Sequence, residues 1–294
     1  MSIQLVIAEK PSVARSIAGV IGADKKQDGY MEGNGYLVSW CIGHLVSFAD
    51  AGRYDERFKK WRYEDLPILP EKWQYIIPDE KKQQFDILRS LMERPDVTGL
   101  VCATDAGREG ELIFRFVYQM AGCEKPFKRL WISSMEDSAI KDGFAHLKPG
   151  TDYDPLYQSA LCRAKADWLV GINATRLFSV LYHKTLTVGR VQTPTLALIV
   201  DREEEIRRFV PQEYFTVQAK CRGFTATWRD RNGQTRTFDR ERAEHLCAAL
   251  QGKHGVLSEV KRTLRQAPPP AAYDLTELQR DANKRFNYSA KETL

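Results

Sequence analysis

A chain of 294 residues is long enough for about two domains, and its 43% hydrophobic and 28% charged residues are ordinary globular usage. No apolar run approaches the about 18 residues of a membrane-spanning helix, and the N-terminal residues lack the charged segment of a secretory signal peptide. The six cysteines form no Cys-x-x-Cys pair, which argues against a zinc site or a disulfide framework and fits a reducing cytoplasm. The formal net charge of +5 permits a nucleic-acid partner without requiring one.

The first predicted element is a short buried strand over residues 5–8, and it runs directly into Glu9 and Lys10. Apolar residues then recur at helical spacing after Pro11, which predicts a helix. A single Glu-Lys pair is most often a surface ion pair. It gains weight only if a second acidic strand end lies beside it.

The next segment predicts a strand over residues 36–42 that ends at Gly43-His44. Residues 45–78 are rich in proline and aromatic residues, and we expect them to be irregular. Aromatics such as Trp61 could stack on nucleic-acid bases, although most such residues pack loops onto cores. A helix is predicted from Phe85 to Met92, before Arg94-Pro95.

The most informative stretch is the octet Thr104–Glu111. An apolar strand over residues 99–103 precedes it, and helical periodicity follows it. Three carboxylates, Asp105, Glu109 and Glu111, therefore crowd a turn at the carboxyl end of a parallel strand, where open α/β sheets hold their ligands. Carboxylates close together suit a hard cation such as Mg²⁺. The alternative is a solvated helix start, because acids also favour the first turn.

A strand over residues 129–132 and a helix over 136–147 complete a pattern of alternating strands and helices, so residues 1–150 predict one α/β domain with a parallel sheet. Residues 151–211 are almost purely helical, with an interruption near 183–189. Basic and polar side chains are spaced along these helices. This pattern fits phosphate contacts or an ordinary solvated face.

From residue 212 to residue 294 the composition turns towards β-structure. Strands are predicted over 214–217, 224–228, 235–238 and 256–260, with helices over 240–250 and 274–286. Pro268-Pro269-Pro270 marks an extended connector. Ser289 followed by Glu292 is a capping-box pattern, which predicts another helix start.

Several of these stretches together resemble one family, the type IA DNA topoisomerases, and within it the bacterial topoisomerase III branch. They occur in the family's order: Ile7–Ser12, Trp40–Leu45, Thr104–Glu111, Ala164–Asn173 and Thr187–Pro194. The first three belong to the Toprim domain, which other enzymes share, whereas the last two are specific to topoisomerases. The resemblance implies a Toprim α/β metal-binding domain (1–150), a helical DNA-binding domain (151–211) and the first part of a β-rich arch domain (212–294).

The resemblance also implies a mechanism. A tyrosine attacks one DNA strand to form a 5′-phosphotyrosyl link, the other strand passes through, and the break is resealed without ATP, which relaxes negative supercoils and separates linked DNA. Glu9 matches the acid that exchanges a proton with the 3′-oxygen and can bind the metal, and Lys10 matches the lysine beside the scissile phosphate. Asp105 matches the first metal carboxylate. Arg163 and Asp167 align with residues that position the cleaved strand.

The implied cofactor is Mg²⁺ and the implied partner is single-stranded DNA, in a nucleoid-associated cytoplasmic location. Positions resembling DNA contacts are Trp61, Trp168, Arg176, His183, Thr187, Val188, Gly189, Arg190, Val191 and Gln192.

Two departures from the family pattern matter. Gly107 stands where many members carry the second aspartate of an Asp-x-Asp pair, so Glu109 or water is expected to take its place at the metal. The family's nucleophile lies in a Tyr-Pro-Arg-Thr-Asp-like segment, and none of the 12 tyrosines here is followed by proline. Tyr288 matches another aromatic position. The sequence therefore predicts an N-terminal part that ends before the catalytic tyrosine and is inactive alone.

Two alternatives remain. One is a non-catalytic module that binds single-stranded DNA, and it would be excluded if the reading frame continued past Leu294 into a tyrosine-containing segment. The other is a different Toprim enzyme, a primase or a nuclease. The segment Gly189–Pro194 argues against that second alternative.

Overall fold

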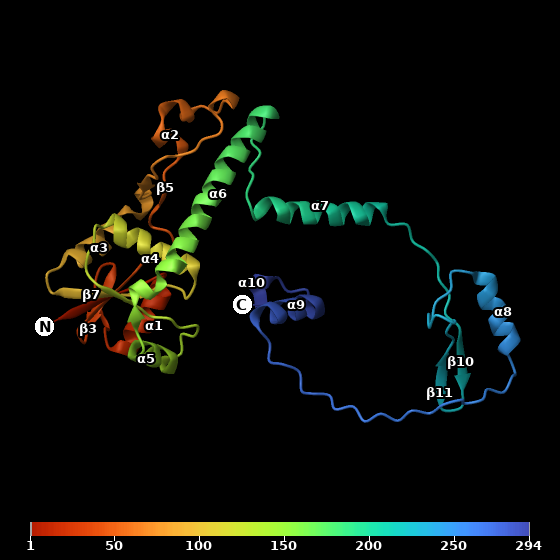
Figure 1. Cartoon of the computed structure of the whole chain (residues 1–294). Coiled ribbons are helices and arrows are strands. Elements are labelled where there is room, and N and C mark those ends of the chain that lie inside the picture. The colour runs from red at the N-terminus through yellow and green to blue at the C-terminus, as the bar shows by residue number, and fades with distance from the viewer. Residues whose placement is uncertain (1, 294) are drawn as a thin grey trace. The chain divides into compact units, whose positions relative to one another are not determined.

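The computed structural model describes residues 2–293. Contacts divide the chain into two compact units, the first extending to Arg208 and the second beginning at Phe209. No helix among the described residues is both long and apolar enough to cross a membrane. Each unit is considered by itself (Figure 1).

The first unit is built on a seven-stranded sheet with the order β2-β3-β4-β1-β7-β8-β9. Its centre, β4-β1-β7-β8, is parallel as predicted, whereas β2, β3 and β9 pair antiparallel at the edges. The strands are β1 (Ile3–Ala8), β2 (Lys25–Lys26), β3 (Tyr30–Gly33), β4 (Tyr36–Trp40), β7 (Val97–Ala103), β8 (Phe127–Arg129) and β9 (Lys148–Pro149). The β2-β3 hairpin was not predicted, and β8 ends earlier than expected.

Helices cover both faces of this sheet because successive side chains of β1 point to opposite sides. Leu5 and Ile7 pack with α3 (Lys82–Glu93), α4 (Arg108–Met120) and the start of α6 (Asp154–Leu181). Val6 and Ala8 pack with α1 (Pro11–Ile21) and α5 (Asp137–Ala145). The predicted α/β class and the helices over these ranges are confirmed.

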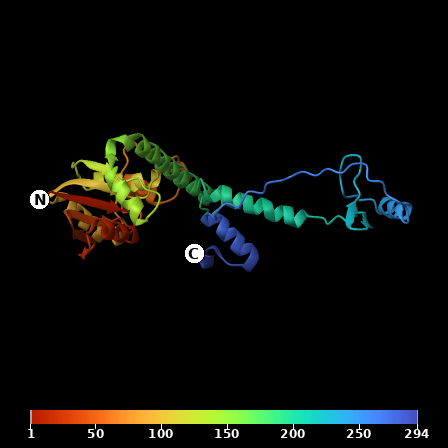
Figure 2. The same cartoon turned by 90° about the horizontal axis from the view of Figure 1, so that it is seen from below.

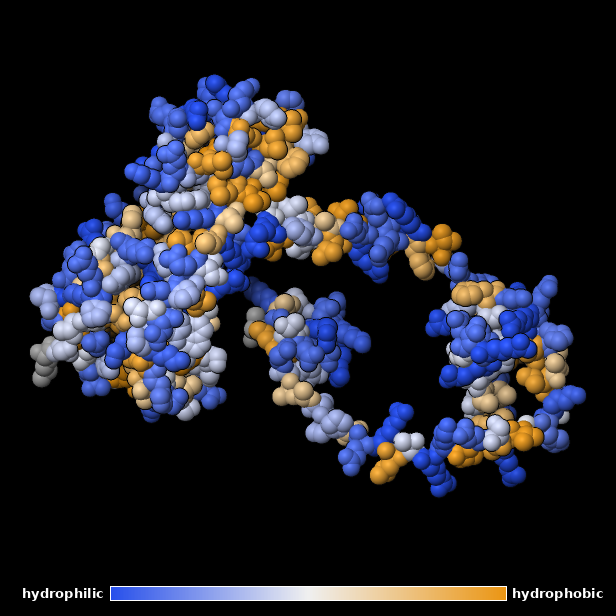
Figure 3. All heavy atoms as spheres, in the orientation of Figure 1, coloured by the Kyte–Doolittle hydropathy of each residue, from blue (hydrophilic) through white to orange (hydrophobic). Residues whose placement is uncertain are grey.

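The helical region of the first unit consists of the 28-residue α6 and of α7 (Gln192–Arg208). Figures 1 and 2 show α6 running from the sheet to the segment around α2 (Ala51–Tyr54). The apolar side chains of α7, such as Leu198 at 71% exposure, lie on the surface (Figure 3). The predicted interruption between the two helices is present.

Residues 45–78 contain only short elements, as expected, yet they are firmly packed. These are β5 (Ser47–Phe48), α2, the 3₁₀ turns η1 (Glu56–Lys59) and η2 (Tyr63–Asp65), and β6 (Tyr75–Ile76). Ala51, Phe58 and Ile68 form a separate small core against Trp168 and Ile172 of α6. Residues 45–78, called the packed segment below, therefore pack against α6 beside the sheet.

The second unit has less strand than the β-rich prediction. It contains the hairpin β10 (Gln218–Cys221) and β11 (Phe224–Thr227), with helices α8 (Arg240–Leu250), α9 (Leu275–Phe286) and α10 (Ala290–Thr293). The strands expected near Phe215 and Thr237 reduce to one bridge between those two residues. The strand predicted over 256–260 is wrong, because its apolar side chains are largely exposed and have no strand to pair with among the described residues.

Side-chain caps begin α9 and α10 in the second unit. The Asp274 carboxylate accepts a hydrogen bond from the Glu277 N–H at 2.7 Å. At α10 the Glu292 carboxylate accepts from the Ser289 N–H at 2.8 Å, and the Ser289 hydroxyl accepts from the Glu292 N–H at 3.2 Å. This reciprocal pair is the capping box read from the sequence.

Candidate functional site

Glu9, Lys10 and Asp105 meet at the carboxyl edge of the sheet. The parallel register places Ala8 opposite Ala103, so the residues that follow β1 and β7 lie side by side. The Lys10 ammonium lies 3.7 Å from the carboxylates of both Glu9 and Asp105. Glu9 is buried, and its carboxylate accepts a hydrogen bond from the Asp105 N–H at 3.3 Å. The structure therefore brings together the three residues that the sequence placed at two strand ends.

Glu109 lies on the first turn of α4 and is held by another residue. Its carboxylate is 2.6 Å from the imidazole of His44, whose carbonyl accepts a hydrogen bond from the Lys81 ammonium at 2.6 Å. Within residues 2–293 no three His, Cys, Asp or Glu side chains are grouped closely enough to hold a metal ion. Glu109 thus does not join Glu9 and Asp105 in one cluster in this conformation.

Glu111, the third acid that was expected to crowd the turn, is paired with two arginines instead. Glu111 is fully buried and belongs to an ion-pair network. Its two carboxylate oxygens lie 2.9 Å from the Arg115 Nε and 3.1 Å from the Arg129 Nε. A buried carboxylate so paired is occupied by protein charges and is not free to bind a solvated ion.

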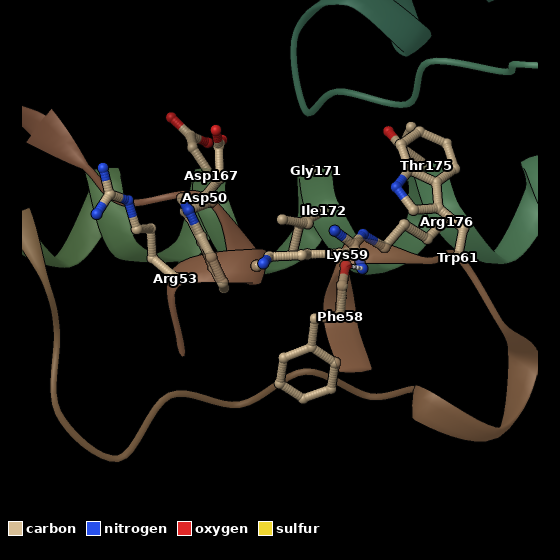
Figure 4. A pocket seen from close by; sticks show the side chains of 12 residues that line it. Asp50, Arg53, Phe58, Lys59, Trp61, Asp167, Gly171, Ile172, Thr175 and Arg176 are labelled. Atoms are coloured by element: carbon tan, nitrogen blue, oxygen red, sulfur yellow. Dashed lines mark hydrogen bonds between the residues drawn. The ribbon is translucent and has the colours of Figure 1, made fainter. Parts of the chain in front are cut away.

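A groove of about 770 Å³ runs between the packed segment and α6 (Figure 4). It is lined by Asp50, Gly52, Arg53, Phe58, Lys59, Trp61, Asp167, Trp168, Gly171, Ile172, Thr175 and Arg176. Three of these side chains carry positive charge and two, Asp50 and Asp167, carry negative charge, and Trp61 offers an aromatic ring that is 44% exposed. Grooves that bind single-stranded nucleic acids combine positive charge with aromatic side chains on which bases stack.

Arg176 forms the floor of the groove below Trp61. Its guanidinium lies 5.4 Å from the centre of the Trp61 ring and donates a hydrogen bond to the Phe58 carbonyl at 2.8 Å. Burial lowers the pKa of Arg176 from its usual value. The side chain therefore connects α6 to the packed segment and also steadies the ring above it.

Trp168 has a packing role in addition to lining the groove. Its indole N–H donates to the Ala49 carbonyl at 3.1 Å, and its ring meets Tyr54 and Trp73 edge to face. The predicted DNA contact at Trp168 therefore has only part of the ring available. Trp61 is the more open of the two tryptophans.

Asp167 lies on α6 between two arginines. It pairs with Arg190 at 2.5 Å and with Arg163 at 3.7 Å. The hydrogen bond from Arg190 is the main reason that the pKa of Asp167 is lowered, so the pair persists at acidities where an ordinary aspartate begins to protonate. Arg163, Asp167, His44 and Glu109 line a second pocket of about 340 Å³. This pocket lies between residues 44–48, the start of α4 and α6, and Glu9, Lys10 and Asp105 do not line it.

The loop between α6 and α7 carries the remaining predicted contacts. His183 has a left-handed backbone (φ 50°) and lines a pocket of about 380 Å³ that also reaches Trp61. The Thr175 hydroxyl accepts a hydrogen bond from the Val188 N–H at 2.9 Å and anchors the loop to α6. Arg190 and Val191 remain exposed beyond it, as does Gln192, the first residue of α7.

Several groove residues were not singled out from the sequence. They are Asp50, Gly52, Arg53, Phe58, Lys59, Gly171, Ile172 and Thr175. The alternation of basic and aromatic residues over 57–62 was a usable signal for this segment. Nothing in the sequence showed that it would pack against α6.

Comparisons with known proteins agree with this architecture. A Toprim domain model matches residues 4–135, and a DNA topoisomerase model matches residues 151–294. DNA topoisomerase 3 of Bacillus subtilis is 50% identical and that of Bacillus licheniformis 51% identical over the whole of this chain, which spans 41% of their length. Full-length topoisomerase I from Thermotoga maritima shares the fold, with a TM-score of 0.66 and 22% identity over 98% of this chain and 44% of its own. The order of the two matched domains and the identity to these relatives show that the chain belongs to the type IA DNA topoisomerase family, in the topoisomerase 3 branch.

Proposed function

We propose that this chain supplies the cation site and the single-strand groove of an ATP-independent topoisomerase that cleaves, passes and reseals DNA strands. The observation that carries the proposal is the convergence of Glu9, Lys10 and Asp105 at one sheet edge. Asp167 of α6 lines both the 340 Å³ pocket, which also contains Glu109 of the first turn of α4, and the groove. The proposed partner is single-stranded DNA, without a nucleotide cofactor, in the cytoplasm.

The donor set fits Mg²⁺ better than a cation that needs a complete protein cage. Glu9 and Asp105 provide two carboxylates at a partly open edge, and Mg²⁺ usually keeps several waters and takes one or two carboxylates. Glu109 is proposed as a further ligand only if it leaves His44. When bound, the ion would offset negative charge on the scissile phosphate.

Acid-base chemistry is assigned to the protein's own side chains. We expect Glu9 to exchange a proton with the 3′-oxygen of the cleaved strand. Lys10 would stabilise charge on the phosphate, since its ammonium already faces both carboxylates across 3.7 Å. Arg163 and Asp167 would hold the strand between the sheet edge and the groove.

We expect the chain to bind single-stranded DNA more tightly than duplex DNA. Replacing Trp61 by alanine should weaken the binding of single-stranded DNA by about 1–3 kcal/mol, the typical value of one stacked base. Fluorescence anisotropy with a labelled oligonucleotide measures this, and affinity should fall as salt rises because phosphate contacts release counterions. Trp131→Ala is the matched control, because Trp131 is also 44% exposed and lies outside the groove. Equal affinity for single strands and duplex would contradict the proposal.

The Gly107→Asp variant should bind Mg²⁺ more tightly than the parent chain. Gly107 has extended backbone (φ −175°), and an added Cβ meets no atom within 4 Å, so the larger side chain fits. Even in water two unit charges 4 Å apart attract by about 1 kcal/mol, which is a factor of about five in affinity. Calorimetric titration tests this, with Gly255→Asp as the control, because a Cβ on Gly255 also meets no atom within 4 Å. An unchanged affinity would show that residue 107 does not face the ion.

The chain of 294 residues should leave supercoiled plasmid unchanged in Mg²⁺, because none of its 12 tyrosines lies in the nucleophile motif of the family. Gel electrophoresis after detergent trapping distinguishes the candidate functions. A ladder of relaxed topoisomers would mean that one of these tyrosines is the nucleophile. Nicked circles would favour the alternative of a Toprim nuclease.

A further inference from the structure

Arg129 is a completely buried arginine at the end of β8, next to the sheet edge but outside the proposed chemistry. Its guanidinium donates to the carbonyls of Thr104 and Asp105, each at 2.7 Å, and to that of Cys102 at 3.0 Å. Cys102 lies near the end of β7, and Thr104 and Asp105 belong to the turn that follows this strand. The Arg129 side chain thus fixes the backbone carbonyls on both sides of the Thr104–Asp105 peptide.

Glu111 makes this buried cation tolerable. Neither side chain is exposed to solvent, and the carboxylate lies 3.1 Å from the Arg129 Nε. An unpaired charge at this depth would be strongly unfavourable. Glu111 therefore neutralises Arg129, and Arg129 holds the turn by hydrogen bonds.

The peptide between Thr104 and Asp105 connects Arg129 to Glu9. In a trans peptide the carbonyl and the N–H point in opposite directions. Arg129 holds the Thr104 carbonyl on one side, and on the other side the Asp105 N–H donates to the Glu9 carboxylate. Fixing the carbonyl consequently fixes the direction of the N–H that orients Glu9.

The first turn of α4 also packs closely against this turn. A Cβ on Gly110 would lie 2.2 Å from the Asp105 carbonyl oxygen, so only glycine permits this approach. The Thr104 hydroxyl donates to the Gly110 carbonyl at 2.7 Å. The turn is thereby held by β8 and α4 together.

We propose that Arg129, neutralised by Glu111, is a positioning residue that sets the Thr104–Asp105 peptide and thereby the relative placement of the Glu9 and Asp105 carboxylates. The inference rests on the proposed function for its purpose, since those carboxylates are the proposed cation ligands. The placement itself is a property of the chain without any ion. The two statements can therefore be tested separately.

The test compares Arg129→Lys with Arg115→Lys. Lysine keeps the charge at position 129 but cannot reach three carbonyls at once. Arg115 pairs with the same Glu111, and its other contacts, with Gly150, Asp154 and the rings of Phe127 and Tyr157, lie outside the turn, so its substitution disturbs the network without touching the turn. The readouts are hydrogen exchange of the Asp105 amide by NMR in metal-free protein and Mn²⁺ affinity by electron paramagnetic resonance.

For Arg129→Lys we expect faster exchange of the Asp105 amide and Mn²⁺ binding weakened by about 10- to 100-fold, the usual effect of losing a residue that orients ligands. Arg115→Lys should leave both unchanged. Unaltered protection of the Asp105 amide in Arg129→Lys, or equal effects of both variants, would overturn the inference. If Arg129→Lys does not fold, Glu111→Asp is measured in the same way, because it withdraws the carboxylate from Arg129 and leaves Arg129 in place.

The proposed function fails separately, if the parent chain binds no Mn²⁺ or if Asp105→Asn binds it as well as the parent. The amide exchange then still decides whether Arg129 positions the turn.

Discussion

Replacing Glu111 by alanine should lower the free energy of unfolding by about 3–5 kcal/mol, the usual cost of removing one partner from a buried ion pair. Arg129 would remain completely buried with its charge uncompensated. Arg115, whose side chain is only 11% exposed, would lose the same partner. Because whole domains are stable by only about 5–15 kcal/mol, this single change would remove much of the stability of the first unit.

Urea denaturation followed by circular dichroism measures the effect. Glu109→Ala is the matched control, because it is an acid on the same first turn of α4 with a side chain that is 58% exposed. Surface substitutions of this kind usually change stability by no more than about 0.5 kcal/mol. Similar losses in the two variants would mean that the Glu111 ion pairs contribute nothing beyond an acid at a helix start.

A double replacement of Glu111 and Arg129 by apolar residues should recover only part of the loss. Removing both charges is often neutral in other proteins. Here the Thr104 carbonyl would lose the Arg129 donor, whereas the Cys102 and Asp105 carbonyls keep backbone donors in Leu130 and Gly107. The incomplete recovery would measure what Arg129 contributes to the turn apart from its charge.

The sheet and its ligand edge could be predicted because they depend on local patterns. Buried strands read as short apolar runs, and residues that follow two parallel strands must lie at the same edge. Glu9, Lys10 and Asp105 were found in this way. The capping box at Ser289 was equally local, since its residues are only three apart.

The octet also shows where local patterns fail. Its three acids look alike in the sequence, but one faces the site, one pairs with His44 and one is buried. What separates them is the position of Arg129, which comes from a different strand. The spacing of Glu111 and Arg115, four residues apart on a helix, was the only local indication that Glu111 has a cationic partner.

The strand predicted over 256–260 failed for a related reason. β-Propensity measures how well a residue fits a pleated, half-buried surface, and Val256 is 92% exposed with no such surface beside it among the described residues. The groove could not be predicted because its walls, residues 50–61 and α6, are about a hundred positions apart in sequence. Only tertiary packing joins them.

Asn173 pairs α6 with the backbone of the packed segment. It lies within α6, and its side-chain amide accepts from the Ile68 N–H at 2.6 Å and donates to the Ile68 carbonyl at 3.0 Å. Ile68 is buried in the small core of the packed segment. The amide therefore pairs with the backbone of Ile68 as a neighbouring strand would.

Asn173→Ala should leave both backbone groups of Ile68 unpaired, at a cost of about 1–3 kcal/mol each. Because the rest of the unit keeps its own core, we expect the segment around residues 50–68 to open locally rather than the whole unit to unfold. Trypsin should then cleave at Arg53, Lys59 or their basic neighbours, and affinity for single-stranded DNA should fall because the groove loses a wall. Cys162→Ala, exposed on the same helix, is the control and should change neither result. If Asn173→Ala resists trypsin and binds DNA like the parent, the apolar core and the hydrogen bonds from Trp168 and Arg176 are enough to hold the groove wall, and the pairing with Asn173 is dispensable.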